Sequence, residues 1–168
     1  NKPVLQQIID QLRPVVKKIV IVSANPEYER FGIELIADKI VNIGPAGGIH
    51  AALSHSDKEK NFFISCDMPL VTSEAIKFII RHSDHYQITL PSYKERTEPL
   101  FGVYSKTCLY QWQALIDRGF TKLLDMITHF DFRKLPVDDN SLFNEMLFTN
   151  LNTKTDFEKL KHHFTYGN

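Results

Sequence analysis

The chain has 168 residues, 43% of them hydrophobic and 24% charged, which is typical of one globular domain with its own core. Lys and Arg together number 20, as do Asp and Glu, so the formal net charge is zero. This balance argues against a broad basic surface, and we therefore expect binding neither to nucleic acid nor to a membrane.

The two cysteines, Cys66 and Cys108, lie in separate apolar runs. They form neither a disulfide framework nor a paired zinc motif, which fits a reducing compartment, so we expect a cytoplasmic protein. No apolar stretch is long enough to span a bilayer, and the N-terminus has no signal-peptide pattern. Without a fold there is no exposed apolar face to assign to an interface, so the default expectation is a monomer.

Hydrophobic periodicity alternates between helical and extended patterns along the chain. In chain order it predicts a helix over residues 4–12, strands over 18–23 and 33–36, a glycine-rich turn over 43–48, a helix from 49 and a strand over 61–66. The second half is predicted to hold a helix over 75–80 capped by Ser73, strands over 86–90 and 99–104, helices over 108–116 and 123–127, strands over 132–137 and 146–148, and a helix over 153–164.

This alternation predicts a single α/β domain, a three-layer sandwich around a mostly parallel sheet. Residues 86–90 and 99–104 follow each other closely, which permits an antiparallel insertion and so a mixed sheet. Ligands of such sheets bind beyond the carboxyl ends of the strands, so the candidate functional residues are sought there.

Asp67 is the first candidate, because it directly follows the predicted strand over 61–66 and precedes Met68-Pro69. A carboxylate at a strand tip suits a Mg²⁺ ion that also contacts phosphate oxygens. The alternative is that Asp67 only begins a turn or caps the next helix.

The second candidate is the glycine-rich turn, with Gly44, Pro45, Gly47 and Gly48. Its glycines let the backbone approach a ligand, and the helix start that follows offers free N–H groups to an anion or a base. It matches neither the dinucleotide fingerprint nor the Walker loop, and a plain turn is the alternative.

Other polar residues also follow predicted strands. Asn25 and Asp38 lie just beyond the first two strands. Asn150 and Asn152, two positions apart on an extended segment, would face one side and could bind a metal or a phosphate, or Asn152 could simply cap the terminal helix.

Four segments taken in order resemble the molybdenum cofactor guanylyltransferase family, within the nucleotidyltransferase superfamily. They are Gly44-Pro45-Ala46-Gly47-Gly48, Cys66-Asp67-Met68-Pro69, Glu98-Pro99-Leu100-Phe101 and Asn150-Leu151-Asn152-Thr153. The resemblance covers nearly the whole chain and implies a Rossmann-like nucleotidyltransferase fold.

The resemblance implies an enzyme that transfers GMP from GTP to the terminal phosphate of molybdopterin and releases pyrophosphate, with Mg²⁺ as its cofactor. Asp67 matches the family's magnesium ligand. Ser23, Asp38 and the turn over 44–48 match positions that contact the guanine nucleotide. Asn150 and Asn152 match the pterin-phosphate and metal side of the cleft.

The family also begins with a strand and a glycine-rich loop that carries an Arg and a Lys, and these 168 residues do not contain it. Two alternative functions stay open. One keeps the chemistry and changes the substrates: a cytidylyltransferase for the same pterin, or a sugar-phosphate nucleotidyltransferase. The other is a nucleotide-binding module without catalysis.

Overall fold

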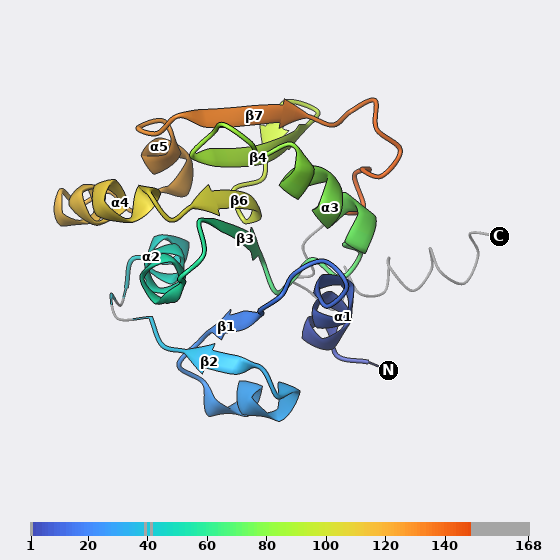
Figure 1. Cartoon of the computed structure of the whole chain (residues 1–168), viewed down its shortest axis with the longest axis horizontal. Coiled ribbons are helices and arrows are strands. Elements are labelled where there is room, and N and C mark those ends of the chain that lie inside the picture. Colours follow the sequence, from blue (N-terminus) through green and yellow to red (C-terminus); the bar gives the residue numbers. More distant parts are fainter. Residues whose placement is uncertain (1, 39, 41, 149–168) are drawn as a thin grey trace.

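A computed structural model of the chain describes residues 2–38, 40 and 42–148 (Figure 1). Its elements, in chain order, are α1 (Val4–Leu12), β1 (Val20–Val22), the 3-10 helix η1 (Pro26–Phe31), β2 (Glu34–Ile36), α2 (Pro45–His55), β3 (Lys60–Ile64), α3 (Ser73–Arg81), β4 (Ile88–Tyr93), β5 (Arg96–Thr97), β6 (Phe101–Ser105), α4 (Cys108–Asp117), α5 (Leu123–Ile127) and β7 (Phe132–Pro136).

The helix starts explain two differences from the predicted boundaries. α2 begins at Pro45 rather than at residue 49, because proline has the φ of a first helical residue and that position needs no N–H donor. α3 is capped by Thr72, whose hydroxyl accepts a hydrogen bond from the Ala75 N–H at 3.2 Å. The predicted cap, Ser73, instead donates from its hydroxyl to the Gln11 carbonyl at 2.8 Å and so ties α3 to α1.

The strands form two sheets. β1 and β2 pair in parallel. In the larger sheet β6 lies between β3 and β4, and β5 and β7 both pair with β4. β6 is antiparallel to both of its neighbours, whereas β7 is parallel to β4. β3, β4 and β7 therefore run in one direction with β6 inserted against them, which confirms a mixed sheet with an antiparallel insertion.

Helices cover both faces of the larger sheet (Figure 1). Side chains of α1 and α3 pack against Phe101 and Val103 of β6. Side chains of α2, α4 and α5 pack on the other face, against Tyr104 of β6 and Ile88 and Leu90 of β4. Val103 and Tyr104 are adjacent in one strand and so point to opposite faces. The three-layer α/β sandwich is confirmed.

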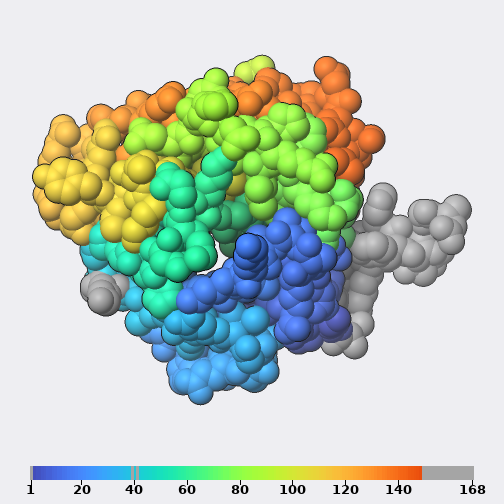
Figure 2. Space-filling model, in the orientation of Figure 1, coloured from blue at the N-terminus to red at the C-terminus, as the bar shows by residue number. Residues whose placement is uncertain are grey.

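The two sheets do not join. Among the strands described, β1 pairs only with β2, and β3 pairs only with β6. Figure 2 shows a hollow between the dark blue α1–β1 segment and the teal segment that leads into β3. Residues of β1 are half-buried throughout, as are Asn61 to Ile64 of β3, whereas all five residues of β6 are buried. A strand edge of β1 and one of β3 thus remain without a described partner.

The strand predicted over 146–148 is wrong, because residues 145–148 form a turn. The Asn144 side chain accepts a hydrogen bond from the Leu147 N–H at 3.0 Å, a local bond that competes with extended pairing. The helix predicted over 153–164 lies outside the described residues. Within the described part of the chain, no helix combines the length and the apolar character that a membrane crossing requires.

Candidate functional site

The predicted nucleotide-binding residues come together where β1 and β2 end against the start of α2. Gly44 has φ +61° and ψ −147°, a conformation that only glycine adopts without strain. Gly47 is buried, and a Cβ placed on it would lie 2.7 Å from the Ile40 carbonyl oxygen and against the Asp38 carboxylate. The turn therefore packs directly on the segment that follows β2.

The two carboxylate oxygens of Asp38 have different neighbours: one accepts a hydrogen bond from a nearby backbone N–H, and the other faces the turn. Its Oδ1 accepts a hydrogen bond from the Ile40 N–H at 2.9 Å, and its Oδ2 faces Gly47. Gly48 packs near Val22, the last residue of β1. Residues that lie more than 20 positions apart in the sequence thus share one corner of the fold.

Ser23 and Asn25 follow β1 and are joined by local hydrogen bonds. The Ser23 hydroxyl accepts from the Asn25 N–H at 3.1 Å. The Asn25 side chain accepts from the Glu27 N–H at 3.0 Å and caps η1. Asn25 therefore has a structural role in this conformation, whereas the half-buried Ser23 directly follows Val22, which packs near Gly48.

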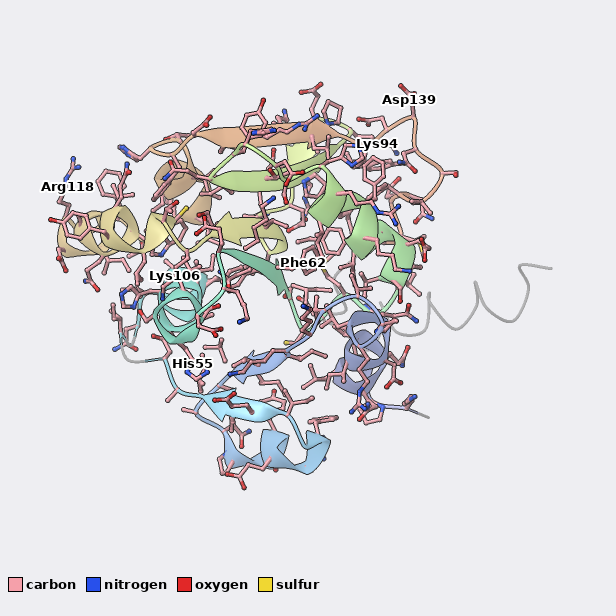
Figure 3. The ribbon with its side chains drawn as sticks, in the orientation of Figure 1. His55, Phe62, Lys94, Lys106, Arg118 and Asp139 are labelled. Atoms are coloured by element: carbon pink, nitrogen blue, oxygen red, sulfur yellow. The ribbon has the colours of Figure 1, made fainter. Side chains whose placement is uncertain are left out.

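Asp67 lies at the same edge of the fold as this corner. His55, the last residue of α2, pairs with Glu34, the first residue of β2, at 3.0 Å. Lys106 follows β6 (Figure 3). Its side-chain ammonium donates to the Ser54 carbonyl at 3.3 Å, and its backbone N–H donates at 2.7 Å to the carbonyl of Glu59, just before β3. β2 and β3 therefore both begin at the C-terminal end of α2, and the segments that follow them, with Asp38 and Asp67, lie at the opposite edge.

Asp67 has an available carboxylate oxygen. Its Oδ1 is buried and makes no hydrogen bond. The neighbouring Cys66 thiol has its pKa raised by desolvation and by the Asp67 carboxylate, so it is protonated at neutral pH and is a poor nucleophile. An unpaired carboxylate oxygen of this kind fits a hard divalent cation such as Mg²⁺.

Glu98 belongs to one of the four segments that carry the family resemblance, but the sequence analysis assigned it no role. It is buried, although its residue type is rarely buried without a partner, and burial raises the pKa of its carboxyl group. Arg96 opposes this pKa shift and Asp67 adds to it. The signal that could have identified Glu98 is its place at the same end of the β3–β6 pair as Asp67, which requires the pairing of two strands far apart in the sequence.

Asn150 and Asn152 lie outside the described residues. Among His, Cys, Asp and Glu side chains in the described ranges, no group of three converges on a point that could hold a metal ion. A cation at Asp67 would therefore complete its coordination with water, with ligand oxygens or with other residue types.

Replacement of Gly47 by alanine tests the close packing of the turn. We expect Gly47→Ala to lower the free energy of unfolding by about 1–3 kcal/mol, because the new methyl group meets the backbone carbonyl of Ile40. Gly48→Ala is the matched control, since its nearest neighbour would be a Val22 methyl group at 3.9 Å. In urea unfolding, that variant should equal the parent protein or exceed it by up to about 1 kcal/mol. Equal stability of the two variants would contradict the packing described.

Comparison with known proteins gives consistent results. The profile of the MobA-like NTP transferase domain matches residues 1–132. A Flavobacterium johnsoniae protein named "Probable molybdenum cofactor guanylyltransferase" is 32% identical over 161 residues, which cover 95% of this chain and 83% of that protein. The molybdenum cofactor guanylyltransferase of Vibrio vulnificus is 29% identical over 158 residues, which cover 91% of this chain and 78% of that protein.

Solved structures agree on the fold. Molybdopterin-guanine dinucleotide biosynthesis protein A of Archaeoglobus fulgidus matches with a TM-score of 0.79 and 22% identity, over 96% of this chain and 85% of that one. A protein from Aquifex aeolicus matches with a TM-score of 0.80 and 21% identity, over 90% of this chain and 80% of that one. The expected Rossmann-like nucleotidyltransferase fold is confirmed.

Proposed function

Because the chain belongs to the MobA-like NTP transferase domain family, we propose that it acts as a molybdenum cofactor guanylyltransferase, transferring GMP from GTP to molybdopterin. The observation that carries the proposal is the unpaired carboxylate of Asp67 at the same edge of the fold as the turn over 44–48. Relatives named for this activity, at 28–32% identity, support the choice of substrates.

The proposed reaction is a phosphoryl-type transfer. An oxygen of the molybdopterin phosphate forms a bond to the α-phosphorus of GTP, the bond between that phosphorus and the α,β-bridging oxygen breaks, and pyrophosphate leaves with the electron pair. The attacking phosphate is already ionised, so the reaction requires no dedicated general base. Catalysis then depends on placing two anions in line and offsetting their repulsion.

Asp67 is proposed to hold Mg²⁺, which would neutralise phosphate charge during the transfer. Its buried Oδ1, which has no hydrogen bond, fits that role. Asp38 and Ser23 are proposed to bind the guanosine part, together with the backbone of Gly44 to Gly48. Close approach of the ligand to this backbone is possible because the turn has no side chain at three of its five positions.

We also propose that the catalytic unit includes one more strand, inserted between β1 and β3. The unpaired edges of these strands and the hollow between them support this (Figure 2). Central strands of a doubly wound sheet are normally buried on both faces, whereas β1 and most of β3 are only half-buried. The chain covers 83% of the Flavobacterium johnsoniae relative, so that relative has further residues that could supply such a strand.

One assay tests both proposals. Pyrophosphate release is measured with molybdopterin and either GTP or CTP, for the 168-residue chain and for the protein with its natural flanking sequence. We expect GTP-dependent release by the longer protein and much weaker release by the shorter chain. Preference for CTP would indicate that the protein is a cytidylyltransferase and not a guanylyltransferase. No release with either nucleotide would contradict transferase function, and equal rates for the two chains would contradict the additional strand.

A further inference from the structure

Asp67 and Glu98 lie at the same end of the paired strands β3 and β6. The two strands pair antiparallel, with Ile64 opposite Phe101. The pairing continues beyond the strands, since the Ser65 N–H donates to the Leu100 carbonyl at 2.9 Å. Asp67 lies three residues after the end of β3 and Glu98 three residues before the start of β6, so both flank this end of the pair, next to turns at residues 66–67 and 99–100. The two carboxylates are close enough for the charge of Asp67 to raise the pKa of Glu98.

Glu98 is held in this place by its backbone. Its N–H donates to the Pro91 carbonyl at 3.2 Å, and its carbonyl accepts from the Phe101 N–H at 3.3 Å. These bonds tie the residue to Pro91 within β4 and to the start of β6. Only 9% of the residue is exposed, so its carboxylate cannot turn freely into solvent.

Both carboxylates have an oxygen without a hydrogen bond. Glu98 Oε2 and Asp67 Oδ1 are each buried, and neither accepts a hydrogen bond. Glu98 pairs with the Arg96 guanidinium, whose Nη2 lies 3.6 Å from Oε2 and whose side chain is 70% exposed. That distance is too long for a hydrogen bond, and solvent screens an exposed charge. The exposed Arg96 guanidinium therefore offsets only weakly the negative charge at these two buried carboxylate oxygens.

We propose that Glu98 is the second protein ligand of a divalent cation site, shared with Asp67. This inference rests on the proposed function, which assigns a cation to Asp67, and extends it to the residue three positions before the neighbouring strand β6. Oxygen ligands from only two carboxylates, with no third His, Cys, Asp or Glu converging among residues 2–38, 40 and 42–148, suit Mg²⁺ or Mn²⁺. Such ions keep several water or phosphate ligands, whereas a structural zinc site would need four protein ligands.

Mn²⁺ binding to the full-length protein without nucleotide tests the proposal. Free Mn²⁺ is measured by electron paramagnetic resonance for the parent protein and for Glu98→Gln, Glu98→Asp and Asp67→Asn. The matched control is Glu95→Gln on the same hairpin, where the side chain is 97% exposed and pairs with Lys134. We expect Glu98→Gln to weaken Mn²⁺ binding at least about tenfold, Glu98→Asp to weaken it less, and Glu95→Gln to leave it unchanged.

Thermal unfolding provides a second measurement that does not depend on activity. Without cation, Glu98→Gln should melt at the same temperature as the parent or higher, because one of two neighbouring negative charges has been removed. Added Mn²⁺ should then raise the melting temperature of the parent more than that of the variant. A folded Glu98→Gln variant that binds Mn²⁺ as tightly as the parent would overturn the proposal, as would a parent protein that binds no Mn²⁺.

The outcomes separate this inference from the proposed function. Loss of Mn²⁺ binding in Asp67→Asn but not in Glu98→Gln would overturn the role of Glu98 and leave that of Asp67. If both variants lose Mn²⁺ binding and the parent protein does not transfer GMP, the shared cation site is supported and the guanylyltransferase function is contradicted.

Discussion

Asp67→Asn is expected to lower the rate of GMP transfer by about 100- to 1,000-fold, with little change in the free energy of unfolding. The amide has the shape of the carboxylate but no negative charge, so it cannot offset a divalent cation. Folding should tolerate the change, because the buried Oδ1 accepts no hydrogen bond that would be lost. The measurement is single-turnover transfer at saturating GTP and molybdopterin, in the full-length protein.

Asp139→Asn is the control for this variant. Asp139 is exposed and follows β7, at the outer corner labelled in Figure 3. Its replacement removes the same charge from the molecule and should leave the transfer rate within about twofold, since solvent screens a distant surface charge. A folded Asp67→Asn variant with the rate of the parent protein would refute the assignment of Asp67 as the cation ligand.

The position of Asp67 could be predicted from the sequence because its cause is local. An apolar run that ends at Asp-Met-Pro marks the tip of a strand, and strand tips of one direction share an edge. The turn over 44–48 could be located for the same reason, since glycine and proline interrupt the apolar pattern directly. α2 begins four residues before the predicted start, because the helical periodicity of the sequence only begins at Ile49.

Glu98 could not be predicted, because its environment depends on pairing between strands that lie more than 30 residues apart. The apolar pattern of residues 99–104 predicts a strand but does not say that this strand lies between β3 and β4. That order brings Glu98 to the same end of the sheet as Asp67. The same limit applies to the break between β1 and β3, since the periodicity of each strand indicates burial but not the identity of its neighbours.

Trp112 of α4 connects the core to the turn, and Trp112→Ala is expected to lower the free energy of unfolding by about 3–5 kcal/mol. The side chain is fully buried, with its ring centroid 5.8 Å from that of Tyr104 and 5.6 Å from that of Phe130. Truncation leaves a cavity between helix and sheet. The control is Tyr110→Ala on the same helix, where the side chain is 88% exposed and the change should stay within about 0.5 kcal/mol in urea unfolding.

Trp112→Phe separates the packing of this residue from its hydrogen bond. The indole N–H donates to the Ala46 carbonyl at 3.0 Å in the protein interior. Phenylalanine keeps most of the ring volume but leaves that carbonyl unpaired, which should cost about 1–3 kcal/mol. Ala46 lies between Pro45 and Gly47 in the turn that is proposed to bind the nucleotide. The variant should therefore also bind GTP more weakly in calorimetric titration, whereas Tyr110→Ala should not. Unchanged GTP affinity in a destabilised Trp112→Phe variant would show that the turn keeps its shape without the indole, and that the backbone of Gly44 and the contact between Gly47 and Asp38 are sufficient to hold it.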